Sequence, residues 1–278
     1  WKTCLVYLDD IILLGKTFDQ HIENLKEIFT RLRTANLKLN AKKCKLFAKE
    51  VNYLGHVIYS DGVKTDPSKV AMVQKWPVPK DKNELRSFLG LATYYRRFVK
   101  DFAKIARPLH QLTEKNRVFQ WSDYCESAFE QLKRELCEAP LLAYPVQGAP
   151  FILDTDASNC GIGSVLSPHI NGEEKVLAYY SRALTKPKRN YRITRRVLLT
   201  VICATKHFHK YLYGRKFLIR SDHAALKWLL NFKDPEGQVA RWLERLQMYD
   251  LKIEHRNNAD ALSRRPCSLD CTYCGRLE

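Results

Sequence analysis

The sequence lacks long apolar runs, a recognisable leader and, over most of its length, a cysteine framework. No stretch approaches the roughly 20 apolar residues of a membrane-spanning helix, so we expect no membrane partner. Trp1-Lys2-Thr3 leads straight into a strand-like segment rather than a signal peptide. The first six of the nine cysteines follow no disulfide spacing, which predicts reduced thiols in an intracellular protein. Because position 1 is not Met, we also expect a longer parent protein.

Positive charge is the property that the sequence has in excess. Its 278 residues carry 47 Lys and Arg against 30 Asp and Glu, a formal net charge of +17. Such a surplus favours a polyanionic partner, most commonly nucleic acid, although a basic protein without one is the alternative. With 45% hydrophobic and 11% aromatic residues, the chain can bury cores, and its length predicts two or three domains.

The N-terminal part predicts two hairpins around one helix. Residues 4–14 are two apolar runs split by Asp9 and Asp10, which indicates a strand, a turn and a strand. Residues 19–35 have helical apolar spacing and form an amphipathic helix. Residues 43–59 predict the second hairpin, with Gly55 inside it.

The middle of the chain predicts a helical domain. Asp66-Pro67 starts one helix, and residues 65–138 continue mainly at helical period, with a final helix over 123–137. Arg96 and Arg97, with nearby lysines, make one face basic. Residues 139–150 hold three prolines and one glycine and predict a linker.

The last part predicts a mixed sheet with helices packed on it. The expected strands are 150–155, 161–167, 175–182, 216–221 and 250–255. The expected helices are 191–213, 223–230, 238–247 and a short one from Asn258. A β-rich opening followed by α/β alternation is typical of this architecture.

Adjacent acids at a turn are costly unless a cation compensates their charge. Nucleotidyl transfer uses two divalent metals bound by carboxylates, so Tyr7-Leu8-Asp9-Asp10 fits such a site. As a short string it also fits an ordinary turn. Its context, with Tyr53-Leu54-Gly55-His56 and Tyr94-Tyr95-Arg96-Arg97-Phe98 downstream, resembles the reverse transcriptases of gypsy-type LTR retrotransposons.

That resemblance implies roles for several residues. Asp9 and Asp10 would be the paired catalytic aspartates of the polymerase palm. Tyr53, Gly55 and His56 would grip the primer end, and Lys43 would either approach the incoming dNTP or remain solvated. The basic Arg96 and Arg97 of the thumb would bind nucleic acid. The family has a further palm aspartate and fingers upstream of Trp1, so we expect no synthesis by this chain alone.

A second set of acids resembles the RNase H domain of the same polyproteins, over residues 144–265. The matching strings contain Asp156, Asp222 and Asp260, on a strand, a strand end and a late helix. In that fold four carboxylates bind two Mg²⁺ ions, one activating water and one stabilising the leaving oxygen. The family places its remaining carboxylate, a Glu, before a Leu-Leu pair, where this sequence has Val197.

Two departures predict impaired RNase H activity. Valine cannot bind a metal, and Mg²⁺ depends on few carboxylates in strict geometry. The family's longer loop before Asp260 is reduced here to Glu254–Asn258. We therefore weigh an impaired enzyme against a module that binds an RNA–DNA hybrid without cutting it. A degenerate reading frame that yields unstable protein is the remaining alternative.

The tail carries Cys267, Cys271 and Cys274. They give an incomplete zinc set, because structural sites use four ligands; a flexible tail towards the next domain is the alternative.

The sequence thus predicts an α/β (α+β) protein with four parts. They are the end of a palm (1–62), a helical thumb or connection (63–143), an RNase H-like mixed-sheet domain (144–265) and a tail (266–278). The resemblance implies Mg²⁺ or Mn²⁺ as cofactor. It implies an RNA–DNA hybrid, a template-primer, dNTP and the remaining Pol polyprotein domains as partners, in a cytoplasmic particle or the nucleus.

Overall fold

The computed structural model describes residues 3–222 and 236–255 of the chain. The chain divides into two compact units, Trp1–Ser60 and Asp61–Glu278. The boundary lies close to the predicted end of the palm at residue 62. Within the described ranges, none of the helices combines the length and apolar character needed to cross a bilayer.

The first unit consists of two small hairpins and one long helix. Its elements are β1 (Cys4–Tyr7), β2 (Asp10–Leu13), α1 (Phe18–Thr34), η1 (Ala41–Lys43), β3 (Val51–Tyr53) and β4 (His56–Ile58). Strands β1 and β2 pair antiparallel, as do β3 and β4. The side chain of Thr17 caps α1 by accepting a hydrogen bond from the Gln20 N–H. Both predicted hairpins and the helix between them are confirmed.

The second unit begins with a helical region that matches the predicted thumb. Its elements are β5 (Gly62–Thr65), α2 (Pro67–Gln74), α3 (Lys82–Tyr94), η2 (Arg96–Phe98), α4 (Phe102–Ile105), α5 (Arg107–Leu112), α6 (Asp123–Cys137) and β6 (Leu142–Ala143). Asp66 caps α2 through its Oδ1, which accepts from the Ser68 N–H at 2.9 Å. A core that includes Phe88, Phe98 and Phe129 fills the space between these helices.

The segment predicted as a linker contains a buried strand. Leu142 is fully buried in the thumb core, and β6 pairs antiparallel with β5. The Ala143 N–H also donates to the Val176 carbonyl at 2.7 Å. Burial of an apolar pair therefore outweighs the prolines that suggested a free connection.

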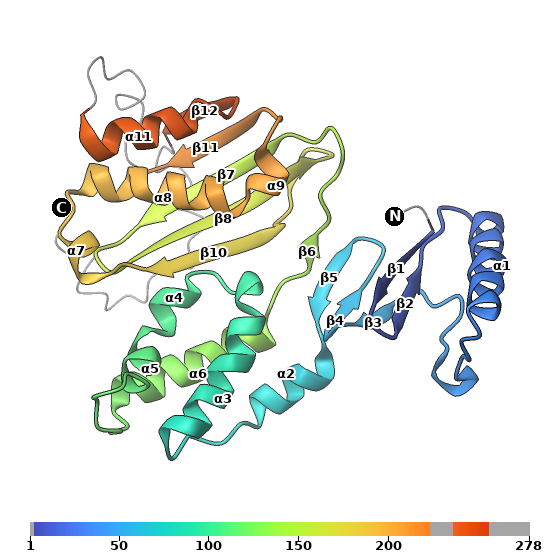
Figure 1. Cartoon of the computed structure of the whole chain (residues 1–278). Helices are drawn as coiled ribbons and strands as arrows, with labels where there is room; N and C mark the ends of the chain where they lie inside the picture. The colour runs from blue at the N-terminus through green and yellow to red at the C-terminus, as the bar shows by residue number, and fades with distance from the viewer. Residues whose placement is uncertain (1–2, 223–235, 256–278) are drawn as a thin grey trace. The chain divides into compact units, whose positions relative to one another are not determined.

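The rest of the unit is a sheet with helices on it (Figure 1). Its elements are β7 (Phe151–Ala157), β8 (Gly161–Ile170), β9 (Glu173–Glu174), β10 (Ala178–Ala183), α7 (Lys186–Arg189), α8 (Ile193–His207), α9 (His209–Leu212), β11 (Phe217–Ser221), α11 (Gly237–Leu246) and β12 (Leu251–His255). The sheet order is β10-β8-β7-β11-β12, with β9 paired to β8. The first three strands run antiparallel, whereas β11 is parallel to β7 and β12. The predicted mixed sheet is confirmed; the predicted helix 191–213 is divided between α8 and α9.

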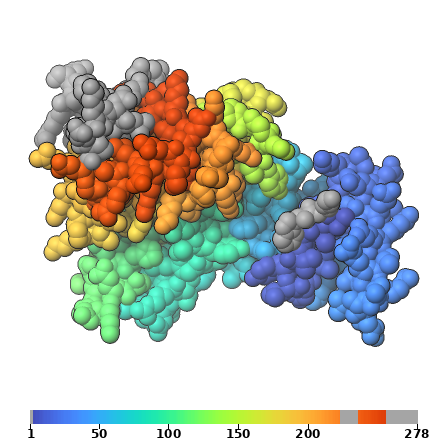
Figure 2. Space-filling view, turned by 45° about the horizontal axis from the view of Figure 1, so that its top comes forward, coloured from blue at the N-terminus to red at the C-terminus, as the bar shows by residue number. Residues whose placement is uncertain are grey.

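The two faces of this sheet have different neighbours. Phe151 and Leu153 of β7 pack with Val201 of α8 in the main core, so α8 covers their face. Successive strand residues point to opposite faces, which places Asp156 on the other face. On β10, Tyr179 packs against the thumb core instead. The thumb and the RNase H-like sheet accordingly adjoin in the space-filling view, green against yellow (Figure 2).

Candidate functional site

The acids of the first unit lie on an exposed hairpin. Tyr7 of β1 pairs with Asp10 of β2, so Leu8 and Asp9 form the two-residue loop. Leu8 adopts a left-handed backbone (φ 53°), which an apolar residue rarely does. Both aspartates are exposed. The predicted strand–turn–strand setting of the acids is thus present.

The residues predicted to grip the primer end form the second hairpin of the same unit. Tyr53 pairs with His56 across the turn, and Leu54 and Gly55 occupy it with φ values of 47° and 65°. Glycine adopts this left-handed conformation at little cost, which explains Gly55. Lys43 lies at the end of η1 and is exposed.

In the second unit, parallel pairing brings two of the predicted RNase H acids together. Ser221 of β11 is in register with Thr155 of β7, so the next residues, Asp222 and Asp156, follow at the same edge of the sheet. Burial raises the pKa of the Asp156 carboxyl, and the charges of Asp101 and Asp222 raise it further. A proton or a cation would relieve this repulsion.

Helix α8 begins beside the end of β7 because Arg196 bonds the loop that follows the strand. The guanidinium Nη1 of Arg196 donates to the Ser158 carbonyl at 3.3 Å and to Asn159 Oδ1. Arg195 instead stacks on Tyr191, with its Cζ 4.2 Å from the ring centre. Val197 is only 4% exposed and belongs to the main core. The expected carboxylate position therefore holds a buried apolar side chain.

The thumb contributes two residues beside Asp156: Lys104, one of the lysines of the predicted basic face, and Asp101, which the sequence motifs did not single out. A cavity of about 20 Å³, large enough for one water molecule, is lined by Asp101 and Lys104 of the thumb and by Asp156, Ser158, Gly161, Ile162, Gly163 and Ser181 of the sheet domain. Asp156 pairs with Gly163, which pairs with Ser181 on β10. No local sequence signal marks Asp101, since this contact joins residues far apart in the chain.

Arg96 and Arg97, predicted to bind nucleic acid, contact β10 and the residue before it. Arg96 donates from Nη2 to the Ser181 carbonyl, and Arg97 donates to the Leu177 carbonyl at 3.5 Å. These bonds give both arginines a structural role between the thumb and the sheet. Arg96 remains largely exposed, so its contact with nucleic acid stays a prediction.

Comparison with known families matches two separate parts of the chain. Residues 1–58 match the family of reverse transcriptases (RNA-dependent DNA polymerases), and residues 121–219 match the RNase H-like domain found in reverse transcriptase. The chain is 42% identical over 270 residues to the retrovirus-related Pol polyprotein from transposon 297 of Drosophila melanogaster. The chain thus carries regions similar to a reverse transcriptase and to its RNase H-like domain, and it resembles the Pol polyproteins of transposons over nearly its whole length.

Two further relatives show the same resemblance. The Pol polyprotein from transposon gypsy of Drosophila melanogaster is 34% identical over 282 residues, and the transposon Tf2-3 polyprotein of Schizosaccharomyces pombe is 32% identical over 268 residues. The three matches cover 95%, 95% and 93% of this chain. They cover 25%, 27% and 20% of the respective polyproteins, so the chain spans about a quarter of their length.

Solved structures show the same fold. The foamy viral protease-reverse transcriptase in complex with RNA/DNA hybrid has a TM-score of 0.79 at 23% identity, over 96% of this chain and 37% of that one. The foamy viral protease-reverse transcriptase dRH in complex with double-stranded DNA also gives 0.79, at 24% identity, over 91% and 46%. The predicted α/β (α+β) class is therefore confirmed.

Several predicted features of this chain lie outside the described residues. They are Asp260, most of the short loop before it, and the tail cysteines Cys267, Cys271 and Cys274. The six cysteines of the described part are free, as predicted. Within the described ranges, the structure has no group of three or more metal-ligating side chains.

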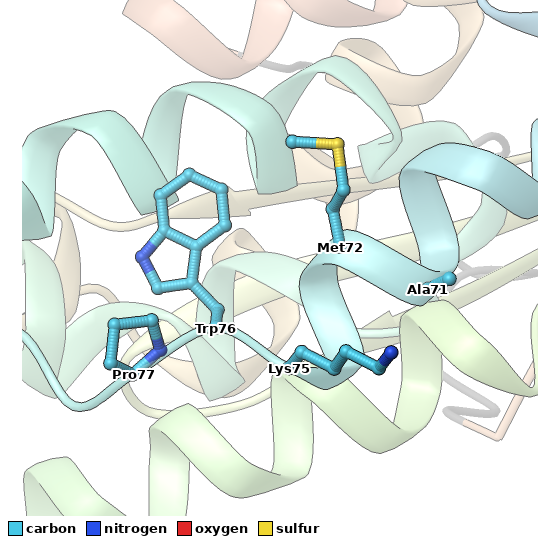
Figure 3. Close-up of a pocket in the computed structure, with 5 residues that line it drawn as sticks. All are labelled: Ala71, Met72, Lys75, Trp76 and Pro77. Carbon is cyan, nitrogen blue, oxygen red and sulfur yellow. The ribbon is translucent and has the colours of Figure 1, made fainter.

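A larger hollow lies on the thumb, and its lining includes none of the predicted acids. It has a volume of about 340 Å³ and is lined by Ala71, Met72, Lys75, Trp76 and Pro77. Figure 3 shows the side chains of Met72 and Trp76 rising from the same side of the α2 segment. Its lining contains no acid or nucleophile, so it has no part in the chemistry of the aspartates.

Proposed function

We propose that this chain is part of an RNA-directed DNA polymerase with an RNase H domain, and that its RNase H-like domain binds RNA–DNA hybrids but cuts them poorly. The decisive observation is the combination of Asp156 and Asp222 at one sheet edge with buried Val197 on α8. These two acids follow neighbouring parallel strands, and α8 carries Val197 where the family resemblance implies a Glu. The dominant positive charge supports a nucleic-acid partner.

The donor set fits a hydrated Mg²⁺ or Mn²⁺ between Asp156 and Asp222. Mg²⁺ usually keeps several waters and binds one or two carboxylates, and the raised pKa of Asp156 reflects repulsion that a cation would relieve. When bound, the metal would supply charge stabilisation at an RNA phosphodiester. Asp156 and Asp222 would hold this cation at the sheet edge, where it would offset their repulsion of the phosphate. Val197 provides no oxygen to hold a second ion there.

In the first unit we propose that Asp9 and Asp10 contribute to the polymerase site, with a template-primer and dNTP as substrates. The support is the match of residues 1–58 to reverse transcriptases and the exposure of both acids on a tight hairpin. The remaining Pol domains would complete this site, because the hairpin itself presents few other polar groups.

The test of the RNase H proposal is to restore the missing carboxylate. We expect Val197→Glu in the full chain to raise cleavage of a labelled RNA–DNA hybrid by several orders of magnitude in magnesium. The Glu carboxylate would supply the absent ligand. Val197→Gln is the matched control, because glutamine has nearly the same shape as glutamate and would be equally buried, but it carries no charge.

Three results distinguish the alternatives. If the Glu variant alone gains activity, and Asp156→Asn abolishes the gain, the wild-type chain is a hybrid-binding module with an otherwise complete site. Equal cleavage by wild type and the Glu variant would show that Val197 does not replace a ligand. If neither cuts while both bind the hybrid and remain folded by circular dichroism, the defect lies elsewhere, foremost in the short loop before Asp260.

A further inference from the structure

Lys104 of the thumb lies next to the acid set of the RNase H-like domain. Its side chain lines the small cavity that also contains Asp156. The positive charge of Lys104 lowers the pKa of Asp156, against the larger opposing effects of burial and of Asp101 and Asp222. Lys104 is exposed, and its ammonium group has no ion-pair partner among the described residues. A cation beside catalytic acids is thus available to a ligand.

Short-range contacts fix the thumb segment that carries Lys104. The Ala103 N–H donates to Ser181 Oγ at 2.9 Å, and Arg96 bonds the carbonyl of the same serine. The Ala103 amide is in the first turn of α4, where N–H groups have no partner within the helix. Ser181 therefore satisfies an otherwise unmade bond and holds α4 against β10.

The Asp101 carboxylate lies directly against Gly163. A Cβ at position 163 would lie 2.7 Å from Oδ1 of Asp101, closer than real Cβ contacts allow. Asp101 has a left-handed backbone (φ 54°), which an aspartate tolerates better than most residues. Gly163 thus leaves room for the carboxylate of Asp101, the residue that precedes α4 and lies three positions before Lys104.

The charges at this place suit a phosphodiester. Asp101, Asp156 and Asp222 together repel a nucleic-acid strand, so a strand that approaches Asp156 requires nearby positive charge. Lysine supplies a flexible, compact point charge for a phosphate. On the other side of the adjoining loop, the Arg196 guanidinium is occupied by Ser158 and Asn159. Lys104 is the cation of this cavity lining.

We propose that Lys104 is a nucleic-acid-binding residue of the RNase H-like site, contributed by the thumb, and that its ammonium binds a phosphate of the strand that lies against Asp156. Asp101 and Gly163 act as positioning residues for it. This inference rests on the proposed function, since it requires that the domain bind a hybrid. It makes the site a composite of two domains rather than a property of the sheet alone.

The test measures the salt dependence of hybrid binding by the full chain. A fluorescent RNA–DNA hybrid is titrated by anisotropy at several salt concentrations and one fixed magnesium concentration. Loss of one phosphate contact should lower the slope of log affinity against log salt by about one. We expect this change in Lys104→Ala, with about three- to tenfold weaker binding at low salt, and recovery in Lys104→Arg.

Two control variants separate position from net charge. Lys216→Ala removes an exposed lysine at the start of β11, the opposite sheet edge from Asp222, and should leave the slope unchanged. Gly163→Ala should displace Asp101 and reproduce the Lys104→Ala slope, whereas Gly161→Ala should not, because its Cβ would meet its nearest neighbour at 3.4 Å. The combination of Gly163→Ala with Lys104→Ala should lower the slope no further.

The possible outcomes distinguish failure of this inference from failure of the proposed function. An unchanged slope in Lys104→Ala, with wild-type binding intact, overturns this inference and leaves the proposed function standing. A wild-type chain with no measurable hybrid affinity overturns both. If the double variant lowered the slope by the sum of the two single-variant reductions, the positioning role of Gly163 and Asp101 would be refuted.

Discussion

The palm segment and the RNase H-like domain both carry paired acids, but very different amounts of structure support them. Asp9 and Asp10 lie at the turn of a two-stranded hairpin whose Val6 and Leu8 are 50% and 84% exposed. Asp156 extends from a central strand whose Leu153 is fully buried under α8. Exposed apolar side chains mark surfaces that bind other protein parts. The difference indicates that the RNase H-like acids are positioned by this unit, while the palm acids depend on additional contacts.

Truncation of one apolar strand residue near each acid set should give the largest difference in stability loss between the two regions. We expect Leu153→Ala to lower the free energy of unfolding of its unit by about 2–5 kcal/mol, because it leaves a cavity in the main core. Val6→Ala should change stability by less than about 0.5 kcal/mol, as its side chain is half exposed. Urea titration followed by tryptophan fluorescence measures both. Equal losses would mean that the palm hairpin is buried in solution.

Removal of an ion pair should also affect stability differently in the two regions, by a smaller amount. Arg220 bonds Asp154 and Glu174, each at 2.7 Å, and its side chain is only 19% exposed. Arg220→Leu should cost about 2–3 kcal/mol, since it removes the guanidinium that pairs with the half-buried Asp154 carboxylate. Arg31, which pairs with Glu27 on exposed α1, is the palm counterpart, and Arg31→Ala should cause no measurable change.

High salt provides the control for these ion pairs. Screening weakens exposed pairs far more than buried ones, so the Arg220→Leu loss should persist at high salt. A loss that disappears with salt would show that the Arg220 pair is solvated and no stronger than that of Arg31.

The sequence predicted the local elements well because their signals are local. Alternating apolar runs around Asp9-Asp10 gave the first hairpin, and Asp66-Pro67 marked the start of α2, where Asp66 does cap the helix. The grouping of Asp156 with Asp222 in one acid set followed only through the family resemblance. Each of these depends on residue spacing or on a motif within a short stretch.

The contacts between thumb and sheet could not be predicted in this way. The sequence predicts Arg96 as a nucleic-acid-binding residue, and only the fold shows that it bonds the Ser181 carbonyl. Asp101 has no motif, and its fit at Gly163 depends on the meeting of two distant segments. The same holds for β6, where burial of Leu142 against the thumb core overrode the prolines of a presumed linker.

Substitution of Asp156 itself tests the smallest effect, the repulsion within the RNase H-like acid set. Its folded-state pKa is raised, first by burial and then by Asp101 and Asp222, so the ionised carboxylate destabilises the fold at neutral pH. Asp156→Asn should therefore increase stability near pH 7, by less than about 1 kcal/mol because the carboxyl is exposed to screening solvent. The gain should shrink as pH falls through the raised folded-state pKa, and vanish below the ordinary aspartate value of about 3.9.

Asp154→Asn, two positions earlier on the same strand, is the matched control for the direction of the stability change. It removes a partner of Arg220 and should lower stability near pH 7, the opposite direction. Urea midpoints of both variants across the acidic range provide the measurement. If Asp156→Asn also lowers stability at neutral pH, attraction to Lys104 outweighs the repulsion from Asp101 and Asp222. The composite site would then be held together by its lysine even without nucleic acid.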